Sequence, residues 1–596
     1  MMSWFQKNTG LVVATIVVVS ALLVFNKIWD ADYVNWDDPD YIYENEVVLE
    51  SEGVFSSNTI RSVFSQQVRS IYSPITILSY VVDKSLYGFD APQKFHITNL
   101  LLHLLVILVI FKLSILWGLN KVAATATTLL FALHPMRVEP VMWLTARKDL
   151  LFALFFFSAL WCYISYYSRD KRRPILYFMV WILFFLSLLT KVLAVAFPVV
   201  LLIYHWSSGK YVLGDWVKKT ALFFIVSLAY GMLSLVLANN FSSLEVSAES
   251  VPFLDRVGLA FSAFSAYVIK SIYPYEMMPV YPYVKAHWGN YFLGITGVSI
   301  YLYMIYYAWK SEWKWIVSGM LFFLVNIALT LQIIPVGQGY LSDRYTYLPY
   351  FGLFIVYGKL LGILWDKRKP VAMALTTVML LIYGYITYSH SEIWKDSDKL
   401  WQHQLRYTPD LSVALKNIAS FHAEKGSTEI AKSYYNRAIA AGSNDPAVYY
   451  YQGLLYFKNP GLGSHEEILS LYDTALSLDE SYAGIHGNRG VLLATMKRYN
   501  EAIESLRMAE SLNRDDPSIY TNQAYVYNEL GQMDQVLTSL EKYVRYRPED
   551  LTTRFQKAKV EYSLGKTEQS IRTLRAILQL KPDYSEVLSY YNNISQ

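Results

Sequence analysis

The chain of 596 residues contains one cysteine and little charge. Asp, Glu, Lys and Arg make up 17% of the sequence, against roughly a quarter in a soluble domain, whereas 54% of the residues are hydrophobic. This balance excludes a wholly soluble protein. Cys162 stands alone in an apolar run, which excludes an internal disulfide, and the net charge of +4 disfavours a nucleic-acid partner.

Several chemical motifs are also missing from the sequence. There is no Gly-rich phosphate loop, no His/Cys spacing typical of a metal site and no nucleophile elbow. Cytosolic nucleotide chemistry is therefore not expected.

The charge is spread unevenly along the chain. The first 400 residues hold 56 Asp, Glu, Lys and Arg residues, whereas the last 196 residues hold 44. An apolar part therefore precedes a soluble part. We predict an all-α protein in which a polytopic membrane helix bundle over residues 1–392 is followed by a soluble domain over residues 393–596.

Apolar runs in the first part predict about eleven membrane spans. A twelfth run, 257–272, is not predicted to cross, because its crossing would move the basic loops at Lys310 and Lys367 to the outside, against the positive-inside rule. The N-terminus is then cytoplasmic, and the first outer loop (29–94) and the soluble domain face the exterior or a lumen. The membrane would be the cell membrane of a prokaryote or the endoplasmic reticulum of a eukaryote. The predicted spans are 10–28, 95–117, 121–136, 149–167, 175–190, 192–206, 219–239, 289–309, 313–333, 347–365 and 371–389.

The soluble part is a repeat array. Small residues recur at Ala419, Gly453, Gly490, Ala524 and Ala558, with steps of 34, 37, 34 and 34 residues. This is the period of tetratricopeptide (TPR) repeats, and it predicts about five repeats over residues 412–585 that stack into an α-solenoid with a concave groove. Such an array most often docks another protein, and it contains no catalytic constellation.

Two adjacent carboxylates, Asp37 and Asp38, open the first outer loop in the segment Asn-Trp-Asp-Asp-Pro-Asp40. Such a pair could hold a proton, bind a cation or act as a general base toward a hydroxyl. With Asp40 it could also hold a divalent metal ion. The alternative is an Asx-type turn, because Asn, Asp and Pro all favour turns.

A polar stripe lies on the second predicted span. His96, Asn99 and His103 are spaced i, i+3 and i+7, so they share one face of the helix. Polar groups are costly inside a membrane, and this face must therefore meet protein or a cavity. A functional site and simple interhelical hydrogen bonding are both compatible with the pattern.

Cations gather in the predicted outer segments, against the positive-inside trend. This arrangement indicates an anionic ligand, and a lipid-linked phosphate or pyrophosphate fits, because Arg and Lys bind phosphate through charge-assisted hydrogen bonds. The outer cations are Arg137, Arg147, Lys148, Lys191 and Arg344, and the same segments contain His134, Glu139, Asp149 and Asp343.

The run 257–272, together with the aromatic loop 273–283, is predicted to form an interfacial or re-entrant element.

These motifs, in this order and followed by TPR repeats, resemble the transmembrane-and-TPR O-mannosyltransferases of the C-type glycosyltransferase superfamily. The resemblance covers nearly the whole chain, with two departures: Ser73 stands where relatives tend to carry Arg before a proline, and the repeat array is shorter than in the animal members of the family. The matching segments are Asp37-Asp38, Tyr72-Ser-Pro74-Ile-Thr, Phe95-His96-x-x-Asn99-x-x-x-His103, His134-Pro with Glu139 and Arg147, Lys191, and Asp343-Arg344-Tyr-x-Tyr-Leu-Pro349.

The resemblance implies a hexosyltransferase that moves a mannose-like sugar from a polyprenyl or dolichyl phosphate to a hydroxyl of a protein or glycan acceptor. It implies Asp37 or Asp38 as the base, and it makes a metal cofactor unnecessary. The TPR groove would present the acceptor on the same side of the membrane. The implied phosphate ligands are Arg137, Arg147, Lys191 and Arg344, and the implied supporting residues are His96, Asn99, His103, His134, Glu139, Asp149 and Asp343.

Two other functions remain open at the level of sequence. One is a non-catalytic membrane scaffold whose repeats recruit a partner and whose outer cations bind lipid. The other is an envelope polysaccharide ligase or polymerase that uses a diphosphate-linked donor.

Overall fold

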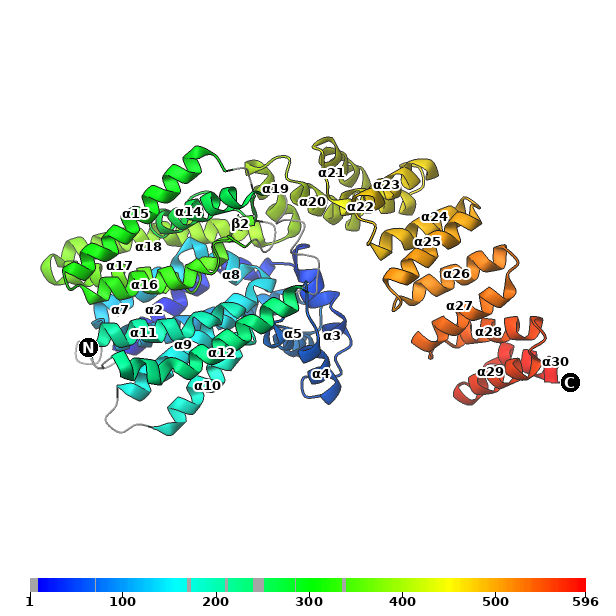
Figure 1. Ribbon diagram of the computed structural model, residues 1–596, viewed down its shortest axis with the longest axis horizontal. Helices are drawn as coiled ribbons and strands as arrows, with labels where there is room; N and C mark the ends of the chain where they lie inside the picture. Colours follow the sequence, from blue (N-terminus) through cyan, green and yellow to red (C-terminus); the bar gives the residue numbers. More distant parts are fainter. Residues whose placement is uncertain are drawn as a thin grey trace. The chain divides into compact units, whose positions relative to one another are not determined.

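A computed structural model describes residues 9–69, 71–168, 173–209, 213–239, 251–283, 286–334 and 339–595. Within these ranges almost all regular structure is helical, which confirms the predicted all-α class. The chain divides into two compact units, residues 1–409 and 410–596. Figure 1 shows the helices of each unit, coloured by their position in the sequence.

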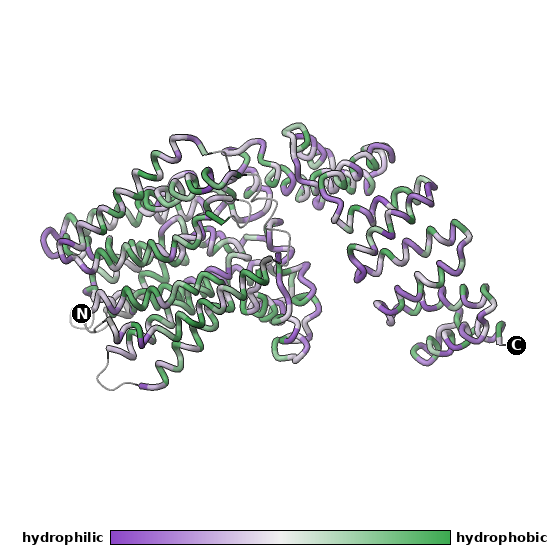
Figure 2. The backbone as a smooth tube through the Cα atoms, viewed as in Figure 1, coloured by the Kyte–Doolittle hydropathy of each residue, from purple (hydrophilic) through white to green (hydrophobic). Residues whose placement is uncertain are grey.

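The first unit is a bundle of long helices. Figure 2 shows that hydrophobic residues dominate these helices, whereas hydrophilic residues are more frequent in the second unit. The helices are α2 (Thr9–Val24), α6 (Pro92–Leu116), α7 (Lys121–Leu133), α9 (Arg147–Tyr167), α10 (Pro174–Leu188), α11 (Phe197–Ser208), α12 (Leu213–Asn239), α14 (Phe253–Lys270), α15 (Trp288–Lys310), α16 (Lys314–Ala328), α17 (Tyr350–Lys367) and α18 (Lys369–Ser391).

Five helical segments of the described chain are long and apolar enough to cross a membrane. A bundle with several candidate spans is therefore confirmed, whereas the number of eleven and the orientation stay predictions. The five segments are Pro92–Leu116, Leu144–Tyr167, Gly214–Leu237, Trp288–Lys310 and Lys369–Trp394, and shorter apolar helices cover Thr15–Val24, Lys121–Leu133, Pro174–Leu188, Val192–Ser208 and Lys314–Ala328.

Short elements connect the long helices, and they contain the predicted site residues Arg137, Glu139, Asp343 and Arg344. The first loop has its own core, in which Tyr41, Val63 and Tyr80 pack with Leu144. In Figure 1, α3, α4 and α5 lie together at one end of the bundle. The short elements are η1 (Asn26–Asp30), η2 (Pro39–Tyr43), α3 (Glu46–Leu49), α4 (Ser57–Ser65), α5 (Pro74–Tyr87), η3 (Pro135–Arg137), α8 (Val138–Met142), η4 (Leu144–Ala146), η5 (Val192–Ala196), η7 (Asp343–Thr346), η8 (Glu392–Trp394) and α19 (Ser397–Tyr407).

One small antiparallel sheet joins the aromatic loop to the segment before Asp343. Strand β1 (Tyr281–Pro282) pairs with β2 (Gly339–Leu341), with Tyr281 opposite Leu341. Gly339 is required there, because a Cβ atom would lie 2.7 Å from the main-chain oxygen of Tyr281.

The second unit consists of five helix pairs and a final helix. Small residues stand where the helices of a pair cross: a Cβ on Gly453 would lie 2.6 Å from the Tyr472 ring. Asp445 and Asp516 cap the first helices of their pairs by accepting main-chain N–H groups. The helices are α20 (Ser412–Glu424), α21 (Thr428–Ala440), α22 (Pro446–Lys458), α23 (His465–Leu478), α24 (Ala483–Thr495), α25 (Tyr499–Leu512), α26 (Pro517–Glu529), α27 (Met533–Tyr546), α28 (Leu551–Ser563), α29 (Thr567–Leu580) and α30 (Ser585–Ser595).

Candidate functional site

The two adjacent carboxylates of the first loop have different surroundings. Asp38 is buried, and its oxygens accept the main-chain N–H of Val34 at 2.9 Å and both the main-chain N–H, at 3.1 Å, and the hydroxyl of Thr145. Burial raises the pKa of Asp38 to about 7, although these hydrogen bonds act in the opposite direction. Asp38 thus fastens the first loop to the segment before α9.

Asp37 is instead partly exposed and paired with a cation. Its Oδ1 lies 2.7 Å from Arg69 Nη1, and its side chain keeps 17% of its surface accessible. The Nε of Arg69 also donates to Asp40. Arg69 has a φ of +46°, in the left-handed region that non-glycine residues rarely adopt. A carboxylate that is both accessible and held by a cation can accept a proton from a bound hydroxyl.

These carboxylates do not form a metal site. Within the described residues, no group of three or more His, Cys, Asp or Glu side chains is arranged to hold a metal ion. Arg69 pairs with both Asp37 and Asp40, so its guanidinium occupies the place that an ion shared by these carboxylates would take. This arrangement, with an arginine between the carboxylates, does not fit a divalent metal ion.

An aromatic contact links the carboxylate loop to Arg344. The ring of Trp36 stacks on Trp143 with centroids 4.4 Å apart, and the guanidinium carbon of Arg344 lies 5.0 Å from the Trp143 ring centre. Trp36 directly precedes Asp37. Asp37, the partly exposed carboxylate, and Arg344 are therefore both placed beside the stacked rings of Trp36 and Trp143.

Arg344 is held in place by Glu139. Its Nη1 lies 2.6 Å from Glu139 Oε1, and its main-chain N–H donates to Oε2 at 2.9 Å. Ser342 Oγ completes the network by donating to Glu139 at 3.2 Å. Burial raises the pKa of Glu139 to about 7, and the positive charge of Arg344 opposes this shift. The Arg344 Nε is buried and has no hydrogen-bond partner within the described chain.

A second cation, Lys191, lies near this network. Its ammonium is paired with Asp149 and lies 5.3 Å from the centre of the Tyr345 ring. Burial lowers the pKa of Lys191, and Asp149 counteracts this effect. Lys148 packs over Tyr41, 4.7 Å from its ring centre.

A small pocket brings apolar and charged groups together at Arg344. Its lining combines apolar side chains such as Phe152 and Leu193 with the charged side chains of Asp149 and Arg344. The lining residues are Asp149, Phe152, Leu193, Asn326, Arg344, Tyr345, Tyr347, Leu348 and Pro349.

The structure separates Arg137 and Arg147 from these partly exposed cations, because both are completely buried. Arg137 donates to the main-chain oxygens of Thr346 and Tyr347 at 3.1 and 2.7 Å. Arg147 is paired with Asp83 at 2.6 Å. Their guanidinium groups fasten segments of the bundle to one another and do not line the pocket, contrary to the uniform phosphate-binding role expected for the four cations.

The polar stripe of α6 forms hydrogen bonds with neighbouring segments. His96 Nε2 lies 3.2 Å from the main-chain oxygen of Asp32, and Asn99 accepts Arg147 Nε at 2.7 Å. His103 bonds to Tyr347 Oη at 2.7 Å and to the oxygen of Ala132 at 3.3 Å. These contacts match the hydrogen-bonding alternative. His134 caps η3, where its Nδ1 accepts the main-chain N–H of Met136.

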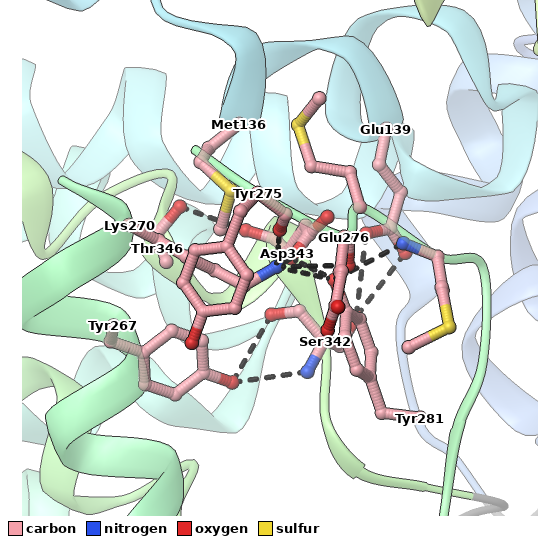
Figure 3. Close-up of polar contacts among 12 residues, drawn as sticks. Met136, Glu139, Tyr267, Lys270, Tyr275, Glu276, Tyr281, Ser342, Asp343 and Thr346 are labelled. Carbon is pink, nitrogen blue, oxygen red and sulfur yellow. Dashed lines mark hydrogen bonds and ion pairs between the residues drawn. The ribbon is translucent and has the colours of Figure 1, made fainter. Parts of the chain in front are cut away.

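Asp343 belongs to a neighbouring cluster that was not predicted (Figure 3). Lys270 is buried and donates to Tyr281 Oη at 2.6 Å and to the main-chain oxygen of Tyr275 at 2.7 Å. Asp343 lies 3.4 Å from Lys270 and accepts the Tyr281 hydroxyl at 2.9 Å. The cluster attaches the aromatic loop to the residue beside Arg344.

Sequence reasoning missed Arg69, Trp143 and Lys270 as parts of the site. Lys270 ends an apolar run and precedes the aromatic loop, a position that could have marked it as a buried cation. Arg69 lies 32 residues after Asp37, and no local sequence pattern marks the two as partners.

Comparisons with known proteins match parts of this chain. A tetratricopeptide repeat family model matches residues 483–516 and 517–550. Protein O-mannosyl-transferase TMTC4 of Mus musculus is 30% identical over 171 residues, which cover 26% of this chain and 23% of that protein. Protein O-mannosyl-transferase TMTC1 of Mus musculus is 36% identical over 103 residues, which cover 16% of this chain and 10% of that protein. The matches thus span less than a quarter of the length of these relatives.

The solved structures that resemble parts of this chain include TPR proteins. The crystal structure of YrrB, a TPR protein with an unusual peptide-binding site, is 16% identical, with a TM-score of 0.29, and the alignment covers 33% of this chain and 99% of YrrB. The resemblance that the motifs predict is confirmed by the sequence matches: this chain is similar to the TMTC protein O-mannosyl-transferases, and it joins a bundle of apolar helices to tetratricopeptide repeats.

Proposed function

We propose that this protein is an integral-membrane glycosyltransferase that moves a mannose-like sugar from a polyprenyl or dolichyl phosphate to a hydroxyl of an acceptor. The observation that carries the proposal is the contact of Trp143 with both Trp36, the neighbour of Asp37, and Arg344. It brings an accessible carboxylate and a cation to one region. The relatives named as protein O-mannosyl-transferases support the same reaction class.

Asp37 is the proposed base. It accepts the proton of the acceptor hydroxyl, while the hydroxyl oxygen attacks the anomeric carbon of the sugar. The bond from that carbon to the phosphate oxygen breaks, and the configuration inverts in this single displacement. Asp38 supports the reaction indirectly, because its bonds to Thr145 fix the loop that carries Asp37.

Arg344 and Lys191 are the proposed cations for the donor phosphate. The leaving lipid phosphate gains negative charge during the displacement, and preorganised cations stabilise such charge most effectively. Glu139 and Asp149 hold the two cations in position. The side chains of the site therefore need little rearrangement when the donor binds. The apolar side chains of the pocket suit the first part of the lipid chain.

We further propose that the TPR unit presents a protein or glycan acceptor on the outer or luminal face of the membrane, with the N-terminus cytoplasmic. Two alternative functions compete with the proposed glycosyltransferase. A scaffold would bind partners and lipid without consuming donor. A polysaccharide ligase or polymerase would consume a diphosphate-linked oligosaccharide.

The donor class is tested by incubating the full-length protein in detergent with radiolabelled polyprenyl-phosphate mannose, polyprenyl-phosphate glucose or a polyprenyl-diphosphate oligosaccharide, together with envelope or luminal protein extracts. We expect label transfer from a monophosphate donor only. Transfer from the diphosphate donor alone would replace the proposal by the ligase function. Consumption of neither donor would favour the scaffold.

A further inference from the structure

Helix α19 (Ser397–Tyr407) occupies an unusual position between the two parts of the chain. It follows the last long apolar helix and directly precedes the TPR unit, which begins at residue 410, yet it packs as part of the first unit. Its buried residues include Trp401 and Gln404, both with essentially no exposed surface. Their contacts reach the two loops that flank the candidate site.

The first contact is with the carboxylate loop. Trp401 Nε1 donates to Asn35 Oδ1 at 2.9 Å, and the main-chain N–H of Asn35 donates to Ser397 Oγ at 2.9 Å. The Trp401 ring meets the Trp36 ring edge to face, with centroids 5.5 Å apart. Both hydrogen bonds involve Asn35, which lies two residues before Asp37. They therefore fix the main chain that leads to Asp37.

The second contact is with the aromatic loop. Gln404 accepts the main-chain N–H of Val280 at 2.9 Å and donates to the oxygen of the same residue at 3.0 Å, so one amide satisfies both main-chain groups. The next residue, Tyr281, donates to Asp343, the neighbour of Arg344. Gln404 is thereby connected to the cation side of the site.

We propose that Trp401 and Gln404 are positioning residues that set the distance between the base Asp37 and the phosphate-binding Arg344. This inference rests on the proposed function, and it assigns α19 to the catalytic unit although the predicted domain limit at residue 392 groups it with the soluble domain. Both residues act through the loops that they bind, Trp401 through Asn35 and Gln404 through Val280. A displacement of about 1 Å between reacting groups can lower a rate by about 10²-fold, so small shifts of either loop are expected to appear in kcat.

The test uses full-length protein with Trp401→Phe, Gln404→Met and the control Gln402→Met. Gln402 lies on the same helix but is exposed, and among the described residues its side chain donates to Asp398, one turn earlier. We expect a roughly 10- to 100-fold loss of kcat for Trp401→Phe and Gln404→Met, with the donor KM within about threefold of the wild-type value. The control should keep the wild-type kcat. Unchanged kcat in both variants, or an equal loss in Gln402→Met, would overturn the inference.

A double-mutant cycle separates positioning from general destabilisation. Asn35→Ala removes the same hydrogen bond as Trp401→Phe, so the combined variant should be no slower than the slower single variant. The pair Asn35→Ala with Gln402→Met should show only the Asn35 effect. Multiplicative losses for Asn35→Ala and Trp401→Phe would contradict a shared positioning bond.

Hydrogen–deuterium exchange keeps this inference distinct from the proposed reaction. Gln404→Met should speed exchange in residues 277–281 and Trp401→Phe in residues 32–38, whereas Gln402→Met should leave both segments unchanged. If the wild-type protein transfers no sugar, the proposed function fails, but this exchange pattern still shows that α19 fixes both loops. Equal exchange in Gln404→Met and Gln402→Met would reject the inference by itself.

Discussion

Asp37 is held by Arg69 at 2.7 Å, across 32 residues of the first loop. The neighbouring Asp38 is bound by Thr145 and buried. Two carboxylates that look equivalent in the sequence are therefore divided by their surroundings into one accessible group and one structural group. This division makes Asp37 the base of the proposed reaction and Asp38 a support for its loop.

The role of Asp38 predicts a stability effect. Asp38→Ala leaves the main-chain N–H groups of Val34 and Thr145 without their acceptor, and each unpaired buried group costs about 1–3 kcal/mol. We expect a clear drop in the thermal unfolding temperature of the detergent-solubilised protein. Asp40→Asn is the matched control, because the ion pair of Asp40 with Arg69 is largely exposed and should contribute less than about 1 kcal/mol. Equal drops for both variants would contradict the structural role.

The pKa of Asp38 predicts a dependence of stability on pH. Because its pKa in the folded protein is about 7, above the value of about 3.9 expected in an unfolded chain, the folded state binds the proton more tightly. This contribution to stability is fully present below pH 4 and is lost as the pH rises through 7. Wild type should therefore be more stable relative to Asp38→Asn at pH 5 than at pH 8.5. Unfolding temperatures that differ by a constant amount across this range would argue against the raised pKa.

The outer cations should separate into two classes on substitution. Arg147→Gln leaves Asp83 buried without its partner, so we expect a loss of about 3–5 kcal/mol in the free energy of unfolding. Arg344→Lys keeps a positive charge near Glu139 but loses the planar guanidinium, so the fold should persist.

For Arg344→Lys the donor KM should rise about tenfold or more, the effect of one lost charge-assisted hydrogen bond. Melting curves and steady-state kinetics on the same preparations check both expectations. An unchanged donor KM in Arg344→Lys would remove Arg344 from the phosphate site.

The packing of the repeats gives a prediction that is independent of the reaction. A Cβ on Gly453 would lie 2.6 Å from the Tyr472 ring, so Gly453→Ala should destabilise the second unit by about 1–3 kcal/mol. Gly487 lies in helix α24 with nothing within 4 Å of its Cβ position, and Gly487→Ala should stabilise that helix by up to about 1 kcal/mol. Circular dichroism melts of full-length variants measure both, and a loss of stability in Gly487→Ala would contradict the described packing.

Periodic features of the sequence predicted the architecture well. The 34-residue step of small residues predicted the helix pairs, because close helix crossings tolerate only small side chains. Apolar runs likewise predicted the long helices of the first unit, although their number as membrane spans stays a prediction. The domain limit at residue 392 placed α19 with the repeats, whereas the compact first unit extends to residue 409.

The roles of individual charges were harder to predict. An outer cation signals an anion nearby, but the sequence does not tell whether that anion is a ligand or a distant residue. Arg147 pairs with Asp83, which lies 64 residues earlier in the chain, and Arg344 pairs with Glu139, which lies more than 200 residues earlier. Such pairs form only when the helices are packed, so local patterns could not separate buried from accessible cations.

The central claim is that Asp37 accepts the proton of the acceptor hydroxyl while a lipid phosphate leaves. It is tested most directly by the kcat of sugar transfer from polyprenyl-phosphate mannose by wild type and Asp37→Asn, with equal unfolding temperatures as the check on folding. We predict a loss of about 10²- to 10⁴-fold in Asp37→Asn, the usual contribution of a general base. Transfer by Asp37→Asn at the wild-type rate would contradict the account.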